Sequence, residues 1–214
     1  MPDTQTQIRS QIQAQIQSPA GSHGGPATIG PNEDVVDLLL AQHARIEELF
    51  LLVTGSTGAA RKDAFDDLVR LLAVHETAEE ELIHPLVRTL PGAGGDAVVE
   101  DRLAEERQAK ETLTTLIDDG VDADGFDTGI LLLREAVLEH ARHEERYEFN
   151  QLRQHVPAER LERMTAAFKA AEAVAPTRPH AGAESATANV AAGPVLAVAD
   201  RVRDAIRRAA DSDR

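Results

Sequence analysis

The chain has 214 residues and a formal net charge of −15, from 37 acidic and 22 basic side chains. Such a molecule repels nucleic acids and anionic membranes unless its basic residues cluster, so we expect neither as a partner. There is no cysteine, which excludes disulfides, thiolate metal ligands and iron–sulfur clusters. Aromatic residues make up only 3% of the chain, so an aliphatic core is required, and this favours helices over sheets.

Two further features bear on where the protein works. No stretch approaches 18 consecutive apolar residues, so the sequence predicts no membrane-spanning helix. The Gln-rich amino-terminal segment lacks the basic end and apolar run of a secretory signal. With the absence of cysteine, these features predict a cytoplasmic protein.

In chain order, residues 1–31 have the Gln-, Gly- and Pro-rich composition of a disordered tail. Asn32 is a suitable N-cap for a first helix that runs to about Val53. Gly and Pro breaks then predict helices over about 61–90, 96–119 and 127–155, with a kink at Pro85 and an N-cap at Asp127.

Four long helices joined by short loops predict an all-α fold, an up-down-up-down four-helix bundle over residues 32–155. An additional helix is expected within 156–175, then a linker over 176–194 and an amphipathic helix within 195–214. That last helix is rich in arginine. We expect it to dock on the rest of the acidic chain or on a second copy, which leaves open a homo-oligomer formed through it.

The apolar stripe of each bundle helix is interrupted near its middle by ionisable residues. Spacings of three and four bring six of them inward: His43, His75, Glu79, Glu106, His140 and Glu144. An unpaired buried ion costs several kcal/mol, on the order of the stability of a whole domain, so these groups need a partner. Two divalent cations would supply it, and nitrogen and carboxylate ligands without sulfur suit iron or manganese, with zinc as an alternative.

The second and fourth helices carry the same pair, a His followed four residues later by a Glu. Residues four apart project from one helix face, so ring and carboxylate can approach one point. The repeat predicts a duplicated hairpin in which Glu79 and Glu144 bridge two metals. The imidazoles would be terminal ligands, and Glu106 would be the sixth protein ligand.

Several neighbouring residues are alternatives or supports. Glu105 could replace Glu106 if the third helix is rotated, and His84 could support a ligand. Tyr147 is expected in the core, and Lys110 is expected to point outward rather than reach a bound anion. Three glutamates lie off the stripes and are expected to face solvent: Glu80, Glu81 and Glu145.

Three segments carry a resemblance to a known family. They are the run from Asp34 to His43, the His75-x3-Glu79-Glu-Glu-Leu-Ile-His-Pro segment, and His140-x3-Glu144-Glu-x2-Glu-Phe. The chain from about Asp34 to Arg153 therefore resembles a hemerythrin-like, HHE cation-binding domain. The resemblance implies a four-helix bundle around two iron ions with an oxo or hydroxo bridge.

The resemblance also implies a function, with one departure. Family members store, carry or sense dioxygen, or handle iron, peroxide or nitric oxide. The oxygen-carrying branch has two His on the third helix where this chain has Glu106 and Lys110, and a His-x4-Asp pair on the fourth. More carboxylate ligands favour ferric iron, which argues against reversible oxygen transport.

The sequence therefore predicts a non-haem di-iron protein that binds or reacts with dioxygen, peroxide or nitric oxide. Whether it is an enzyme, such as a peroxide- or oxygen-reducing oxidoreductase, stays open at this point. The alternative is a non-catalytic iron or oxygen sensor whose C-terminal helices signal to a partner.

Overall fold

The computed structural model describes residues 34–91, 95–174 and 193–212, and within these ranges every regular element is a helix. The all-α class and the bundle with additional C-terminal helices are thereby confirmed. Three features predicted from the sequence lie outside the described residues: the tail over 1–31, the N-cap at Asn32 and most of the linker over 176–194.

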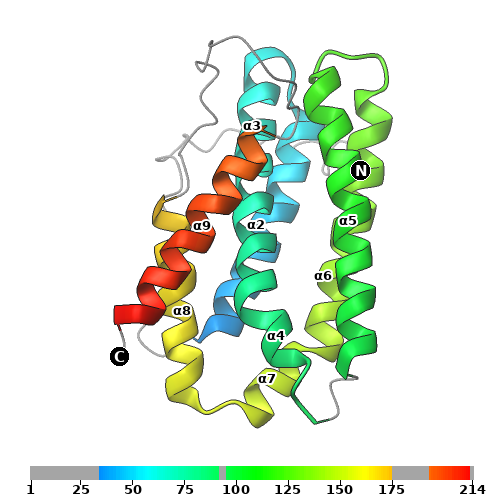
Figure 1. Ribbon diagram of the computed structural model, residues 1–214. Coiled ribbons are helices and arrows are strands. Elements are labelled where there is room, and N and C mark those ends of the chain that lie inside the picture. The colour runs from blue at the N-terminus through cyan, green and yellow to red at the C-terminus, as the bar shows by residue number, and fades with distance from the viewer. Residues whose placement is uncertain (1–33, 92–94, 175–192, 213–214) are drawn as a thin grey trace, which may run out of the picture.

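Four long helices form the bundle (Figure 1). They are α2 (Val35–Gly55), α3 (Gly58–Ala78), α5 (Gly95–Asp119) and α6 (Phe126–Tyr147). A π-helical turn, η1 (Glu79–Ile83), and the short α4 (His84–Val87) extend α3. The chain then continues through α7 (Phe149–His155), α8 (Ala158–Val174) and α9 (Gly193–Ser212). Helix α8 packs against α2 and α3, and α9 packs against α3 and α8, on the side away from α5 (Figure 1).

Two predicted caps are corrected by the structure. Asp34 is the N-cap of α2, because its carboxylate accepts hydrogen bonds from the backbone N–H groups of Val36 at 2.9 Å and Asp37 at 3.1 Å. Gly125 occupies the N-cap position of α6 and makes no side-chain cap. Asp127, predicted as that cap, instead pairs with the guanidinium of Arg61 on α3.

The irregularity expected at Pro85 is a π turn that lies immediately before it. The backbone N–H of His84 bonds the carbonyl of Glu79, five residues earlier. A π turn inserts one extra residue, so the face that carries Glu79 continues at His84 rather than at Ile83. Single π turns within α-helices are frequently found at functional sites.

The apolar core consists of two clusters at the two ends of the bundle. One contains Phe50, Leu68 and Ile130, and the other contains Leu39, Val87 and Phe168, all of them fully buried. Each cluster supplies a water-free layer, since interiors of this kind pack as densely as organic crystals. The polar residues described below lie between these two layers.

The C-terminal helix docks on its own chain, one of the two alternatives expected from the sequence. Val198, Val202 and Ile206 are buried against the bundle, and the guanidinium of Arg203 contacts Glu80 at 3.4 Å and Glu81 at 3.1 Å. Two of the three glutamates predicted to face solvent, Glu80 and Glu81, therefore hold α9 in place. Self-association through this helix stays a prediction.

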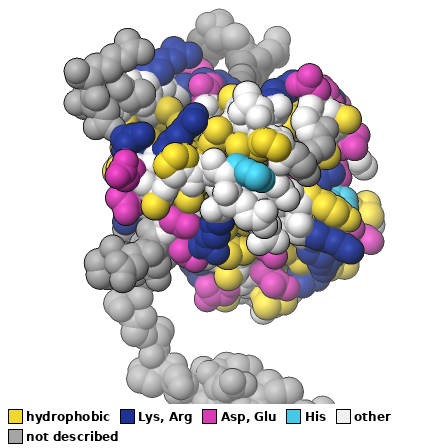
Figure 2. Space-filling view, turned by 90° about the horizontal axis from the view of Figure 1, so that it is seen from below, with side chains coloured by type: hydrophobic (Ala, Val, Ile, Leu, Met, Phe, Trp, Pro, Cys, Tyr) yellow, Lys and Arg dark blue, Asp and Glu magenta, His cyan; other side chains and the backbone are white. Residues whose placement is uncertain are grey.

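The surface carries both signs of charge. Figure 2, which looks at the lower end of the molecule, shows acidic and basic side chains interspersed with hydrophobic ones. The net negative charge is therefore not gathered on that face. Among the described helices, none combines the length and apolar character needed to cross a membrane.

Candidate metal centre

Buried ionisable side chains from α2, α3, η1, α4, α5 and α6 meet in the layer between the two apolar clusters. The most deeply buried are Glu79, Glu144 and Glu148, each with 0% of its surface exposed. The others are at most 6% exposed: His43, His75, Glu76, His84, Glu106 and His140. Carboxylates are almost never buried without a partner, so this layer requires compensating positive charge.

The first group of potential ligands joins three helices and the π turn. The group consists of His43, His75, Glu79 and Glu144. Each offers one ligand atom, and these four atoms lie within 4.8 Å of one another. The two imidazole Nε2 atoms are 3.1 Å apart, Nε2 of His43 is 3.4 Å from Glu144 Oε2, and Nε2 of His75 is 3.3 Å from Glu79 Oε2. Atoms bonded at about 2.1 Å to one ion are about 3.0 Å apart at a right angle and about 3.4 Å apart in a tetrahedron. The spacing therefore fits a shared metal ion.

The second group contains Glu76, Glu106 and His140, whose ligand atoms also lie within 4.8 Å of one another. Glu144 connects the two groups. Its Oε2 faces His43, whereas its Oε1 is 3.4 Å from Nε2 of His140. One carboxylate thus faces the imidazoles of both groups, as a ligand that bridges two metal ions would.

The outer ring nitrogens of His43 and His140 are held by carboxylates. Nδ1 of His43 lies 2.8 Å from Glu145 Oε1, and Nδ1 of His140 lies 3.1 Å from Glu105 Oε2. A carboxylate accepts only, so each Nδ1 carries the proton, and in a neutral ring the lone pair is on Nε2, toward the centre. Carboxylate–histidine pairs of this kind commonly orient metal ligands and strengthen them.

His75 is oriented by an amide that is itself fixed from outside the bundle. Gln42 Nε2 donates to Glu172 Oε1 on α8 at 2.7 Å, so its Oε1 is left to accept from Nδ1 of His75, also at 2.7 Å. The lone pair of His75 therefore points from Nε2 toward the bare Nε2 of His43. Two lone pairs 3.1 Å apart repel unless a proton or a metal ion lies between them.

The centre also contains polar atoms without partners. Among the described residues, no hydrogen bond reaches either oxygen of Glu79, Glu144 or Glu148, Oε2 of Glu76, or Nε2 of His140. A buried carboxylate without a partner costs several kcal/mol. Bound cations would compensate the charge of these unpaired acceptors, which face one another.

Burial and mutual repulsion change the acidities of these groups. Burial raises the pKa of Glu76 to about 8, and burial together with the charge of Glu144 raises the pKa of Glu148 to about 7. Burial and the same charge raise the pKa of Glu79 well above its usual value. Burial alone would lower the pKa of His140, but Glu144 and Glu105 outweigh it and raise that pKa well above its usual value. In the absence of a compensating cation, these carboxyl groups and His140 therefore keep their protons to a higher pH than usual.

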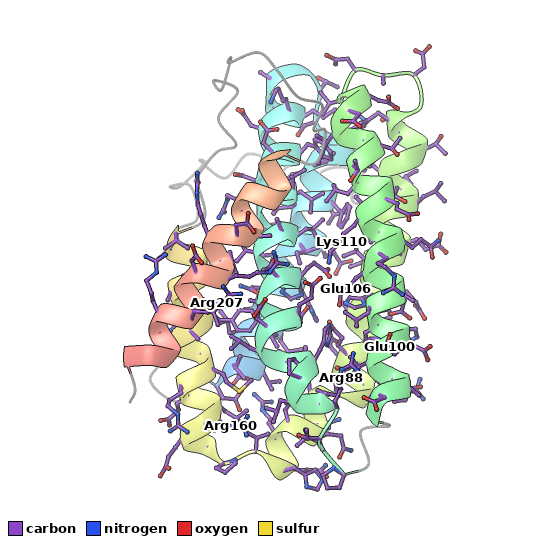
Figure 3. All side chains as sticks on the ribbon, in the orientation of Figure 1. Arg88, Glu100, Glu106, Lys110, Arg160 and Arg207 are labelled. Carbon is purple, nitrogen blue, oxygen red and sulfur yellow. The ribbon has the colours of Figure 1, made fainter. Side chains whose placement is uncertain are left out.

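The side chain of Lys110 does not point outward as predicted. Its ammonium group turns inward, contacting Glu106 Oε2 at 3.2 Å and the carboxylate of Glu80. Figure 3 shows Lys110 one turn above Glu106 on α5. Lys110 partly neutralises a carboxylate that the sequence assigned to metal alone, and it connects α5 to the π turn.

All six residues singled out from the sequence lie in this layer, and two of its carboxylates were missed. Glu76 was missed because it lies beside His75, off the stripe traced along α3, yet its carboxylate lies with Glu106 and His140 across the bundle. Glu148 was missed because the stripe of α6 continues from Glu144 in a step of four, whereas a step of three leads to Tyr147. Tyr147 is 48% exposed, so its predicted core position was wrong.

The supporting residues differ from expectation in two further ways. Glu105, the alternative to Glu106, bonds the outer nitrogen of His140 and also His143, so it lies outside the ring of unpaired acceptors. Glu145, predicted to face solvent, holds His43 while remaining 41% exposed. Both roles depend on which helix lies opposite, which a single helix pattern does not specify.

Two cavities adjoin the centre. A small one, of about 10 Å³, is lined by His43, His75 and His140 together with apolar side chains of α2 and α6. A larger one, of about 140 Å³, lies beside Glu76 and Glu106 and is closed on one side by Ala199 and Arg203 of α9. The first has room for about one water-sized molecule.

Comparison with known families gives a direct match. The model of the hemerythrin HHE cation-binding domain matches residues 34–152, more than half of the chain. The chain belongs to the hemerythrin HHE family. With the His/Glu groups described above, this membership makes it a metal-binding, hemerythrin-like protein.

Individual relatives add little to this assignment. A DNA nickase from Nostoc sp. (strain PCC 7120 / SAG 25.82 / UTEX 2576) is 25% identical over 174 residues, which cover 79% of this hemerythrin-like chain. The match covers 49% of the nickase, so the chain spans about half the length of that relative. No solved structure matches the chain.

Proposed function

We propose that this hemerythrin-like protein binds two iron ions and uses them to bind or react with dioxygen, peroxide or nitric oxide. His43 and His75 would hold one ion, and Glu106 and His140 the other, with Glu79 and Glu144 shared between them. Glu76 joins the second ion as an additional carboxylate ligand. Two iron ions held there would supply electrons and coordination positions for a small ligand.

The composition of the layer supports iron. Imidazoles and carboxylates without sulfur are the ligands of non-haem iron and of manganese, and the high share of carboxylate favours the ferric state. Oxidation of the metal by a small ligand is therefore favoured over a reversible, unreacted complex.

The small cavity is the observation that carries the proposed reactivity. Three imidazoles line it, and its volume of about 10 Å³ limits an incoming ligand to roughly the size of one water molecule. Dioxygen, peroxide and nitric oxide are close to this size. Glu76 also lines it, and the apolar side chains of Ile46, Val137, Leu138 and Ala141 make up the rest of the lining.

The supporting residues have defined tasks in this proposal. Glu145, Gln42 and Glu105 keep the protons of three imidazoles on the outer nitrogen and so present three lone pairs to one region. Phe149, stacked on His43 with the ring centroids 5.6 Å apart, keeps that ring in place. The chain thus pre-organises its ligands before any ion arrives.

The experiment is anaerobic loading with Fe²⁺, followed by addition of dioxygen, hydrogen peroxide or nitric oxide in separate samples. We expect at least two irons per chain, new near-ultraviolet absorption on mixing, and consumption of at least one of the three ligands. His75→Ala should lower iron affinity at least tenfold and remove the reaction, because it deletes a central ligand. His155→Ala, at an exposed position, is the matched control and should change neither. Protein that retains no iron, or that retains iron and consumes none of the three ligands, contradicts the proposal.

A sensor is the second candidate, and one contact favours it. Arg203 of α9 is paired with Glu80 and Glu81, the two residues that follow Glu79 in the π turn. A change in metal occupancy at Glu79 would therefore reach α9 through a single turn of helix. If the protein is a sensor, iron should change the hydrogen-exchange protection of residues 193–212 severalfold, whereas unchanged protection contradicts this function.

A further inference from the structure

A third group of potential ligands lies in the same layer, next to the two groups, and it consists of His84, Glu144 and Glu148. One ligand atom from each lies within 4.8 Å of the others, and all three residues are buried. His84 and Glu148 belong to neither of the two groups described above. We propose that His84 and Glu148, with an oxygen shared from Glu144, form a third cation site for a divalent first-row metal ion.

The tautomer of His84 is the first argument. Its Nε2 lies 2.6 Å from Glu106 Oε1, and because a carboxylate can only accept, Nε2 carries a proton. In a neutral ring, Nδ1 is then a bare lone pair. That atom has no hydrogen-bond partner among the described residues, and it faces Glu148. As at His43, His75 and His140, one ring nitrogen is held by a side chain and the other is left to bind a metal, although here the holding side chain is Glu106 of the second group.

The distance between the facing atoms is the second argument. Nδ1 of His84 is 4.0 Å from Glu148 Oε2, which is too long for a proton to bridge as a hydrogen bond. Two ligands bonded at about 2.1 Å to one ion can lie up to about 4.2 Å apart. The gap therefore suits a metal ion placed almost directly between the two atoms.

The absence of any hydrogen bond to Glu148 among the described residues is the third argument. Neither of its oxygens has a hydrogen-bond partner among the described residues, and the side chain is 0% exposed. Arg102 is a nearby cation, but its guanidinium bonds Glu105 at 2.9 Å and no hydrogen bond joins it to Glu148. Arg102 and His140 act on the carboxylate through their charge, but among the described residues no side chain donates a hydrogen bond to it.

The chemistry of this site predicts weaker, exchangeable binding. One nitrogen and two carboxylate oxygens leave open positions that water would fill, and one of the oxygens is shared with the two-metal centre. Binding of the third ion therefore depends on the proposed function, because the two-metal centre must be occupied. We expect it to bind at least tenfold more weakly than the other two.

The test is a count of Fe²⁺ ions by anaerobic equilibrium dialysis and elemental analysis. The wild-type chain should bind three ions at saturation, and Glu148→Gln, which keeps the shape but removes the charge, should bind two. Glu148→Leu provides a second variant, since an apolar residue in this layer does not depend on a cation for stability. Glu135→Gln, at an exposed position on α6, the helix that ends just before Glu148, is the control and should bind three.

The outcomes separate the two proposals. Two ions in both the wild-type chain and Glu148→Gln would overturn the third site and leave the two-metal centre intact. Three ions in Glu148→Gln and Glu148→Leu would also overturn it, since the ion would then lie elsewhere. Fewer than two ions in the wild-type chain would contradict both proposals.

Discussion

Replacement of Glu144 by alanine is expected to abolish binding of both ions of the centre rather than of one. Its two oxygens face different imidazoles, His43 and His140, each at 3.4 Å, and the side chain is 0% exposed. Loss of the carboxylate therefore removes one proposed ligand from each ion. We expect affinity for each ion to fall by a factor of a hundred or more, measured by competition with a calibrated chelator.

The neighbouring residue supplies the matched control for this prediction. Glu145→Ala, the same change one residue later, removes the partner of His43 Nδ1 but leaves every inner ligand atom in place. Loss of such an outer partner typically weakens metal binding by about 10- to 100-fold. Glu144→Ala protein that retains one ion at wild-type affinity would contradict a shared role for this carboxylate.

The metal-free protein is expected to lose stability as the pH rises from 7 to 9, which is the reverse of ordinary acid denaturation. The pKa of Glu76 is raised to about 8 and that of Glu148 to about 7, and the pKa values of Glu79 and His140 are also raised. Between pH 7 and 9, each of these groups is protonated to a greater extent in the folded chain than in the unfolded chain. Because stability falls with pH wherever the folded state binds more protons, the free energy of unfolding must decrease.

The expected loss is on the order of 2 kcal/mol between pH 7 and 9, because one unit of pKa corresponds to about 1.4 kcal/mol. Burial and the neighbouring His43 place the pKa of His75 well below its usual value, so His75 opposes the trend only below about pH 6.5. Urea unfolding of chelator-treated protein at several pH values measures the effect.

Two comparisons test the cause of this pH dependence. Glu76→Gln removes one titrating carboxyl, so the decline in stability should become shallower. Iron-loaded protein should show no decline over the same range, since a metal-bound carboxylate holds no proton to lose. A urea midpoint of the metal-free protein that stays constant from pH 7 to 9 would contradict the prediction.

The residues interrupting the apolar stripes could be recognised without coordinates because their spacing is local. His75 and Glu79 lie on one helix face whatever surrounds that helix, and the same holds for His140 and Glu144. The order and length of the helices follow from Gly and Pro breaks and from the apolar period. Composition alone excluded sulfur ligands. The sequence by itself therefore determined a helical bundle with imidazoles and carboxylates facing inward.

Other features depended on contacts between distant segments. Glu76 joined the polar layer because α5 and α6 bring Glu106 and His140 next to it, which the pattern of α3 alone does not indicate. His84 joined the polar layer because a π turn advanced the helix face by one residue, which a fixed period of 3.5 or 3.6 does not anticipate. Lys110 turned inward because Glu80 was brought opposite it.

The protonation pattern was also decided by tertiary structure. Which nitrogen of each imidazole faces the centre depends on Glu145, Gln42 and Glu105, and each of these comes from a helix other than that of its histidine. Side chains lose their exposure, gain partners and shift their pKa only when separate helices meet. Helical periodicity determines which side chains share a face, but only packing determines what each face meets, and that decides where cations are required.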